Sequence, residues 1–536
     1  MRIGGDRRVG FNRMLVLLMS AMQSMLPGRL GCPTMVAASG DLFMGIDCGT
    51  QSTKALVYDA STKRVLGTGS CETPLDPNPE GIVGRAEQSP KIWVDAMIEA
   101  TSAALAAAAA ADGCSSSSIG ERVRCIGVSG QQHGLVALDA EYEVIRPAKL
   151  WCDVESSAEA AELTRALGSP IVPSFTITKL LWLKRHEPER FERLAHIALP
   201  HDYLNYVLTG RLVAECGDAS GTGLLDPKTR TWDEDAARLV DDALFDKLPP
   251  LIGPAETVGR LRPEAASMLG LAEGIAVAPG GGDNMMSALG CGCTTVGRVA
   301  MSLGTSGTLF ARTASAALDP SGAVCPFLDA TGGGLPLLCT LNCAAPAEEV
   351  RHAFGLSREE ITELALKESP GCEGVTFLPY LNGERSPNWP GASGAVVGLR
   401  PGLLRPGLLY RAAVEGAVFG LKAGISALQE HGVPARVSEL RLVGGGSRSA
   451  LWRQIIADAT QMRVAVPVEA ESAALGAALQ AAAVHAGADD LSEWISSNHD
   501  APIELAVEPN RDHVVIDAYE SAYQRFRERG GALFAP

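Results

Sequence analysis

The chain has no excess of basic residues. Its 46 lysines and arginines are outnumbered by 62 aspartates and glutamates, which gives a formal net charge of −16. This balance argues against nucleic acid as a partner and against binding to an anionic membrane surface. The sequence GxxxxGK[ST] is also absent from the chain. Its absence argues against a P-loop nucleotide site.

The 13 cysteines lack regular spacing. Scattered cysteines, several of them inside expected strands, predict reduced thiols in an intracellular compartment. Cys291 and Cys293 lie close together, but no second pair or histidine stands at ligand spacing nearby, so no metal site is predicted there. A hydrophobic content of 46% with 20% charged residues is typical of a globular protein. A chain of 536 residues exceeds one ordinary core and predicts two domains.

Residues 1–41 differ in composition from the remainder. They are rich in arginine, with Asp6 as the one acid before Asp41, and so resemble an organellar transit peptide of a plastid or mitochondrion. The apolar run 14–19 is too short to span a bilayer. A secretory signal peptide also fits this run, although the cysteine usage weighs against it. Translation from Met14 or Met35 would leave a cytoplasmic protein instead.

Three glycine turns carry the functional signal. The run Gly280–Asn284 ends the apolar stretch Ile275–Ala278 and reads as a strand that stops in glycines and presents Asp283. Glycines permit backbone conformations closed to other residues and let a ligand approach closely. Asp283 is therefore a candidate base, and a turn-capping aspartate is the structural alternative.

The other two turns, in 43–59 and 299–310, each read as strand, turn, strand. Their small hydroxyl residues and glycines offer hydroxyl groups and backbone N–H groups to phosphate oxygens. Asp47, in the first hairpin, is placed to hold a hydrated divalent cation. Ordinary hairpin turns do not readily explain why two hairpins of the phosphate-binding type occur in different halves of one chain.

Taken in order, these motifs resemble the sugar kinases of the FGGY family, which share the fold of actin, hexokinase and the heat-shock ATPases. The resemblance runs from Leu42 to Ala483. It is carried by Gly45–Thr53, Ser174–His186, Gly280–Asn284, Gly304–Gly307 and Leu442–Ser447.

The resemblance implies an α/β, two-domain, actin/hexokinase-like (ribonuclease H-like) fold with the active site in the interdomain cleft. It predicts a sugar-binding domain with the catalytic aspartate over 42–291 and a nucleotide-binding domain over 292–490. Residues 1–41 would be an extension, and 491–536 a C-terminal helix and tail.

The resemblance also implies a role for individual residues. Asp283 would accept the proton of the sugar hydroxyl, and Asp47 would bind Mg²⁺ through water. The sugar would contact Gln132, His133, Trp151, Asp153, Asp283 and Asn284. The phosphates of ATP would lie against Gly49, Thr50, Gln51, Ser52, Gly304, Thr305, Ser306 and Gly307, and the adenosine against Gly444, Gly445 and Gly446.

Within the family, the segments Ser129–Gly134, Arg146–Asp153 and Phe377–Arg385 are most similar to the xylulokinases. The implied reaction is ATP- and magnesium-dependent phosphorylation of D-xylulose at O5, which feeds the pentose phosphate pathway. Two alternatives stay open: a kinase for D-ribulose, L-ribulose or glycerol, and a non-catalytic nucleotide-binding regulator on the same fold. The expected partners are small molecules, without nucleic acid or membrane, and a homodimer is compatible with the sequence.

Local patterns predict several elements. We expect a helix through 93–111, followed by a low-complexity surface loop at Cys114–Ser118, and a strand at 124–128. Long helices are expected over 408–430 and 471–483, the latter rich in alanine and glycine and suited to close packing. Beyond residue 505 we expect one amphipathic helix and a disordered end.

Overall fold

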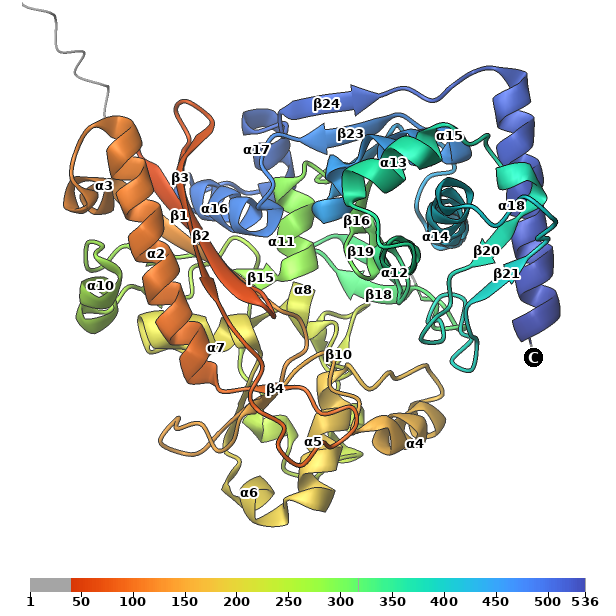
Figure 1. The fold of residues 1–536 in the computed structure, drawn as a ribbon. Helices are drawn as coiled ribbons and strands as arrows, with labels where there is room; N and C mark the ends of the chain where they lie inside the picture. The colour runs from red at the N-terminus through yellow and green to blue at the C-terminus, as the bar shows by residue number, and fades with distance from the viewer. Residues whose placement is uncertain (1–39, 317, 536) are drawn as a thin grey trace, which may run out of the picture. The chain divides into compact units, whose positions relative to one another are not determined.

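The structure is a computed structural model that describes residues 40–316 and 318–535. The predicted transit peptide and the start sites at Met14 and Met35 lie outside these residues. Figure 1 shows the fold.

The first sheet has seven strands in the order β13-β14-β5-β1-β2-β3, with β15 also paired to β5. The strands β1, β2 and β3 form an antiparallel meander, whereas β5 runs parallel to β1, and β14 and β15 run parallel to β5. Their bounds are β1 (Leu42–Cys48), β2 (Ser52–Asp59), β3 (Arg64–Glu72), β5 (Val123–Gly130), β13 (Gly259–Arg260), β14 (Ala276–Val277) and β15 (Gly281–Gly282).

The second sheet repeats this plan, with the order β18-β19-β17-β16-β22-β23-β24. Here β16, β17 and β19 form the meander, while β22 runs parallel to β16 and β23 runs parallel to β22. The bounds are β16 (Arg298–Leu303), β17 (Gly307–Phe310), β18 (Cys325–Leu328), β19 (Gly334–Thr340), β22 (Glu439–Val443), β23 (Val464–Pro467) and β24 (Ile503–Val507). The chain therefore contains two copies of one strand arrangement.

Helix α2 (Pro90–Asp112) covers one face of the first sheet (Figure 1). A Cβ on Gly67 or Gly69 of β3 would lie 2.2 Å or 2.1 Å from backbone atoms of α2, so the two backbones meet directly. Of the described helices, α2 alone is long and apolar enough to cross a membrane. Its packing against the sheet identifies it as a core helix.

Helix α16 (Ser472–His485) covers the opposite face of the same sheet, although its sequence lies in the second half (Figure 1). A Cβ on Gly45 of β1 or Gly127 of β5 would lie 1.9 Å or 2.1 Å from a carbonyl oxygen of α16. Gly290 and Gly476 allow an equally close approach between α16 and α11 (Asp283–Gly290). The predicted close-packing surface is confirmed.

Two local predictions are wrong. Helix α3 (Ser116–Arg122) begins inside the expected loop 114–118, because the side chain of Ser115 caps it by accepting from Ser118 N–H. At the C-terminus, α18 (His513–Phe534) continues to Phe534 where a disordered end was expected, since aromatic side chains anchor it in the second core. The edge strand β24 was not foreseen.

The helix expected over 408–430 is present as α14 (Pro406–Glu430). The structure also contains α15 (Ala450–Thr460), α5 (Thr176–His186), α6 (Pro188–Arg193) and α7 (Pro200–Thr209). The remaining helices are α4 (Ser157–Leu167), α8 (Cys216–Ala219), α9 (Glu234–Arg238), α10 (Pro263–Leu269), α12 (Ala344–Ala353), α13 (Arg358–Leu366) and α17 (Leu491–Asn498). The remaining strands are β4 (Glu87–Gln88), β6 (Val136–Leu138), β7 (Ala148–Lys149), β8 (His196–Ala198), β9 (Ala214–Glu215), β10 (Leu225–Asp226), β11 (Thr231–Trp232), β12 (Leu251–Ile252), β20 (Thr376–Leu378) and β21 (Ala395–Val397).

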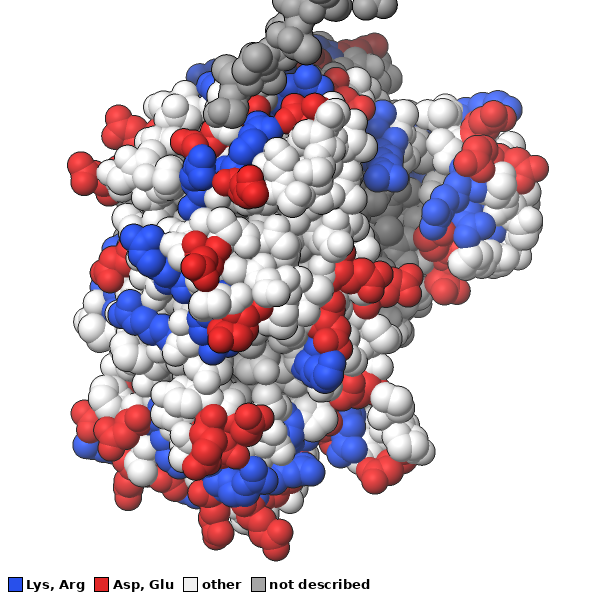
Figure 2. Space-filling model, turned by 90° about the vertical axis from the view of Figure 1, so that its left-hand side faces the viewer, with Lys and Arg blue, Asp and Glu red and all other residues white. Residues whose placement is uncertain are grey.

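Figure 2 shows the charges on one face of the molecule. Basic and acidic side chains are interspersed over the described residues there, and no extended basic patch gathers on that face.

Candidate active site

Asp47 and Asp283 lie at one edge of the first sheet, where three neighbouring strands end. Asp47 is paired in register with Ser129 of β5, and Ser129 is paired in turn with Gly281 of β15. Asp283 follows β15 directly and opens α11. The carboxyl ends of parallel strands thus bring together two acids that are far apart in sequence.

Asp283 is suited to accept a proton. Its Oδ1 accepts a hydrogen bond from Nδ2 of Asn284 at 2.8 Å. Burial, followed by the negative charges of Asp47 and Asp218, raises the pKa of Asp283 to about 8. A carboxylate with a raised pKa is a stronger proton acceptor than an ordinary aspartate.

Asp47 accepts a hydrogen bond from Ser129 Oγ at 2.7 Å. Burial also raises the pKa of this carboxyl group. Lys54, its register partner on β2, pairs with Glu471 at 2.5 Å instead. No basic side chain of the described residues forms an ion pair with Asp47, and two acids at one strand edge repel each other, so this donor set fits a hydrated divalent cation.

A hydrogen bond between Gln132 and Asn284 connects the turn after β5 to the run Gly280–Asn284, which we call the catalytic turn. Gln132 Oε1 accepts from Asn284 Nδ2 at 2.7 Å. Gln132 Nε2 is buried and has no acceptor among the described residues. A buried donor without a partner costs about 1–3 kcal/mol, so this nitrogen favours a hydrogen-bonding ligand.

His133 has a backbone φ of 61° and is buried. Its ring packs against Phe175 and Phe327, with centroid separations of 5.7 Å and 5.1 Å. Its Nδ1 lies 3.6 Å from Oδ1 of Asp218. Burial lowers the pKa of His133 against the opposing effect of Asp218, so the ring is neutral and has one donor and one acceptor nitrogen.

Trp151 lies beside the first phosphate turn. Its indole Nε1 donates to Thr50 Oγ1 at 2.9 Å, and Thr50 Oγ1 donates to Gln131 Oε1 at 3.1 Å. Trp151 is 37% exposed. Trp151, which was predicted to contact the sugar, therefore lies beside the turn that was predicted to bind the phosphates of ATP.

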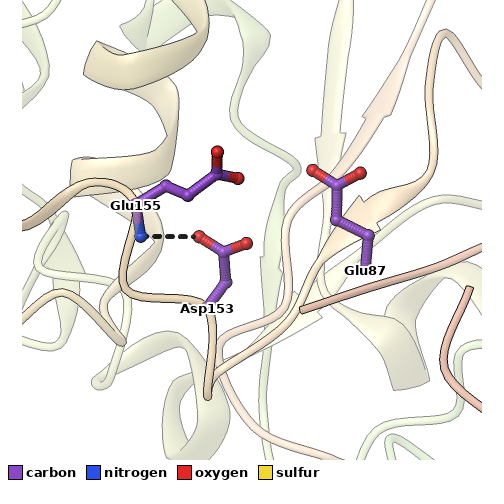
Figure 3. Close-up of side chains that lie close together, drawn as sticks. All are labelled: Glu87, Asp153 and Glu155. Carbon is purple, nitrogen blue, oxygen red and sulfur yellow. Dashed lines mark hydrogen bonds between the residues drawn. The ribbon is translucent and has the colours of Figure 1, made fainter. Parts of the chain in front are cut away.

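Asp153 lies in a cluster with Glu87 and Glu155, whose carboxylates face one another in Figure 3. The spacing resembles a metal site, but the buried ammonium group of Lys149 pairs with all three acids, at 3.1 Å from both Glu87 and Asp153. Asp153 also accepts from the backbone N–H groups of Ala86 and Glu155. Because both of its oxygens have protein partners, the structure gives Asp153 a supporting position, and its contact with a sugar stays a prediction.

Each phosphate turn is closed by a backbone hydrogen bond from its first glycine, but the first turn is one residue longer than the second. In the first, Gly49 N–H donates to the carbonyl of Ser52 at 3.1 Å, with Thr50 and Gln51 between them. In the second, Gly304 N–H donates to the carbonyl of Ser306 at 3.0 Å.

The second turn also contacts the start of α12. The carbonyls of Gly304 and Thr305 accept from the N–H groups of Ala344 and Cys343, while Gly307 begins β17. The positive end of a helix therefore lies beside this turn, which favours an anion.

The glycine run Gly444–Gly446 follows β22 and contacts the end of β16. A Cβ on Gly444 would lie 2.9 Å from the carbonyl oxygen of Leu303, and one on Gly446 would lie 2.7 Å from Leu303 Cβ. Gly444 also has a φ of 82°, and Gly445 is exposed. Glycine is required here by both conformation and space, which leaves bare backbone next to the second phosphate turn.

Sequence reasoning missed three residues near these groups. Asp218 faces His133 and accepts from His201 Nδ1 at 3.1 Å. Arg385 contacts Cys325 Sγ at 3.7 Å, and its charge contributes to the lowered pKa of His133. Gln480 bonds to the backbone of Gly280. Arg385 lies in the segment Phe377–Arg385, which was recognised without a role for this residue, whereas nothing in the local sequence distinguishes Gln480.

Comparison with known proteins agrees with this geometry. Residues 42–290 match the N-terminal domain of the FGGY family of carbohydrate kinases, and residues 299–485 match the C-terminal domain. A xylulose kinase of Streptomyces rubiginosus is 40% identical over 90% of this chain and 96% of its own length. A xylulose kinase of Haemophilus influenzae is 38% identical over 82% of this chain and 90% of its own length.

Among solved structures, a xyloylose kinase from Brucella ovis superposes with a TM-score of 0.83 at 33% identity. The match covers 92% of this chain and 99% of that one. The two duplicated sheets described above are therefore those of the actin/hexokinase-like fold, which confirms the predicted fold class. On these matches, the chain belongs to the FGGY family of carbohydrate kinases.

Proposed function

We propose that this carbohydrate kinase transfers the γ-phosphoryl group of ATP to O5 of D-xylulose, giving D-xylulose 5-phosphate and ADP with Mg²⁺ as the cation. The observation that carries the proposal is the group formed by Asp283, Asn284, Gln132 and His133 at the strand ends. It combines one raised-pKa carboxylate with neutral amide and imidazole groups, a set that suits a polyhydroxylated, uncharged acceptor. The names of the relatives support the choice of xylulose.

The chemistry assigned to the chain begins with Asp283. Its carboxylate takes the proton of the O5 hydroxyl while that oxygen attacks the γ-phosphorus, and the bond between this phosphorus and the bridging oxygen of ADP breaks. Asn284 orients the carboxylate through its 2.8 Å hydrogen bond. The raised pKa of Asp283 places the base nearer to the pH at which it must act.

Mg²⁺, held through water by Asp47, would neutralise charge on the phosphates of ATP. The N–H groups and hydroxyls of the two phosphate turns hold the phosphate oxygens, and the start of α12 favours their charge. The bare backbone at Gly444–Gly446 lets the adenosine lie close to the chain.

Gln132 and His133 orient the ketose. Gln132 Nε2, which lacks a protein acceptor, donates to a hydroxyl or carbonyl oxygen of the sugar. A site that hydrogen-bonds each hydroxyl leaves a partner unpaired when the wrong epimer enters, and this gives selectivity.

A substrate panel tests the proposal. ADP formation would be followed with D-xylulose, D-ribulose, L-ribulose, glycerol and gluconate, and kcat/KM compared. We expect the highest value for D-xylulose. A higher value for D-ribulose or glycerol would assign the site to that substrate, and ATP binding without any phosphorylation would favour the non-catalytic regulator.

A further inference from the structure

The middle of α16 contains a buried glutamine in an otherwise apolar environment. Gln480 is fully buried and is surrounded in sequence by alanine, leucine and glycine. A buried amide without hydrogen-bond partners destabilises a folded protein. Its two polar atoms therefore need partners inside the protein, and both find them on one residue.

That residue is Gly280. Gln480 Oε1 accepts from Gly280 N–H at 2.8 Å, and Gln480 Nε2 donates to the Gly280 carbonyl at 3.1 Å. Two parallel hydrogen bonds fix both the position and the orientation of a backbone segment more strictly than one bond does.

Gly280 lies where the chain leaves the sheet and is the first residue of the catalytic turn. Ala278 N–H still bonds to β5, and pairing resumes at Gly281, so Pro279 and Gly280 form an interruption between β14 and β15. Gly280 has a φ of 79°, and a Cβ there would lie 2.2 Å from the carbonyl oxygen of Val128. Interruptions of this kind occur beside active sites and re-aim the residues that follow.

Side chains from two helices hold this interruption. Asn205 of α7 donates to the Pro279 carbonyl at 2.8 Å, and Gln480 of α16 pairs with Gly280. Asp283 follows three residues after Gly280. The direction of its carboxylate therefore depends on where these two amides hold the backbone.

We propose that Gln480 is a positioning residue of the phosphoryl transfer: it holds the Pro279–Gly280 interruption so that Asp283 reaches the attacking hydroxyl. This inference rests on the proposed role of Asp283 as the base. It also ties the catalytic turn of the first sheet to a helix that belongs to the C-terminal family domain, whose model covers residues 299–485.

The test is a double-mutant cycle with Gln480→Met and Asp283→Asn. We expect Gln480→Met to lower kcat at least about tenfold while the KM values for ATP and D-xylulose change less than about threefold, since a misplaced base affects the chemical step. In the Asp283→Asn background, Gln480→Met should lower kcat no further, because its effect acts through Asp283. Gln454→Met on α15, which removes an exposed glutamine that bonds to Asp458 at 2.8 Å, is the control and should leave kcat unchanged.

Gln480→Glu provides a second readout, including the case in which Gln480→Met does not fold. A neutral carboxyl group can donate and accept as the amide does, whereas an ionised one can only accept. The kcat of Gln480→Glu relative to the unmodified protein should therefore fall as pH rises. Unchanged kcat in both Gln480 variants, or an equal loss from Gln480→Met in both backgrounds, would overturn the positioning role. A high kcat for Asp283→Asn alone would instead remove the base, and with it this inference.

Discussion

Gly221 lies directly under the ring of His133. A Cβ built on Gly221 would be 1.8 Å from His133 Cε1 and 2.2 Å from Nδ1, so any side chain at this position must displace the imidazole. The ring is held from its other sides by Phe175 and Phe327. The turn Gly217–Thr222 therefore determines where the histidine can lie.

Gly221→Ala should weaken sugar binding with little effect on ATP. Displacement of the imidazole would remove the hydrogen bonds that we propose between it and the ketose. We therefore expect the KM for D-xylulose to rise about tenfold or more, the value of one lost hydrogen bond to a bound polar group. The KM for ATP should stay within about twofold of its original value. Steady-state kinetics with each substrate varied in turn checks this, and His133→Ala should show the same pattern. Equal losses for both substrates would contradict a sugar-contact role for His133.

Asp283→Asn should remove most of the sugar phosphorylation while the protein stays folded. The amide keeps the size of the side chain but cannot accept the hydroxyl proton, so kcat should fall about 10²–10⁴-fold. The measurement is kcat at saturating D-xylulose and ATP, with a thermal melt to confirm folding. A folded variant that keeps more than about a tenth of the original kcat would take Asp283 out of the mechanism.

The activity should rise with pH through the titration of Asp283. Because burial and neighbouring acids raise its pKa to about 8, the carboxyl group is mostly protonated below that pH and becomes a competent base above it. We expect kcat/KM for D-xylulose to increase between about pH 6 and about pH 9, a range in which an ordinary aspartate no longer titrates. Higher Mg²⁺ should move this rise to lower pH, since a nearby cation favours the ionised form. A flat profile over the range would show that the base is already ionised.

The N-terminal extension should be dispensable for catalysis. The first strand begins at Leu42, which is fully buried, so a variant that starts at Met35 keeps every strand of the first sheet. We expect it to retain kcat and melting temperature. Loss of folded, active protein would contradict a targeting role for residues 1–41. Sequencing the N-terminus of protein purified from its source would show whether the segment is removed.

The strand ends and glycine turns of the site could be predicted from sequence because their signals are local. Apolar runs that stop in glycine identify Asp47, Asp283 and both phosphate turns within a few residues. The hydrogen-bond partner of Gln480 could not be predicted in this way, because it lies 200 positions away in the sequence. Helix α16 is also apolar on all sides, so its sequence does not show which face points toward the site.

Asp153 illustrates the opposite case. Its sequence segment was assigned to the sugar, but the buried ammonium of Lys149 and two backbone N–H groups occupy its oxygens. Only the folded arrangement shows which carboxylates already have partners. The tail beyond residue 505 is similar, because the burial of Tyr519 and Phe526 depends on a core built from other parts of the chain.

Asp47→Asn should raise the Mg²⁺ requirement more than it lowers the maximal rate. Asp47 has one hydrogen bond, from Ser129, and no basic partner among the described side chains, so its charge is free to hold a hydrated cation. An amide oxygen is a weaker ligand for Mg²⁺ than a carboxylate, and the Mg²⁺ concentration at half-maximal rate should increase about tenfold or more. The measurement is the initial rate as a function of free Mg²⁺ at fixed ATP, for the variant and for Ser129→Ala as a control that keeps the carboxylate. If Asp47→Asn reached the same rate at the same Mg²⁺ concentration as the unmodified protein, Asp47 would serve only to cap the neighbouring strand end.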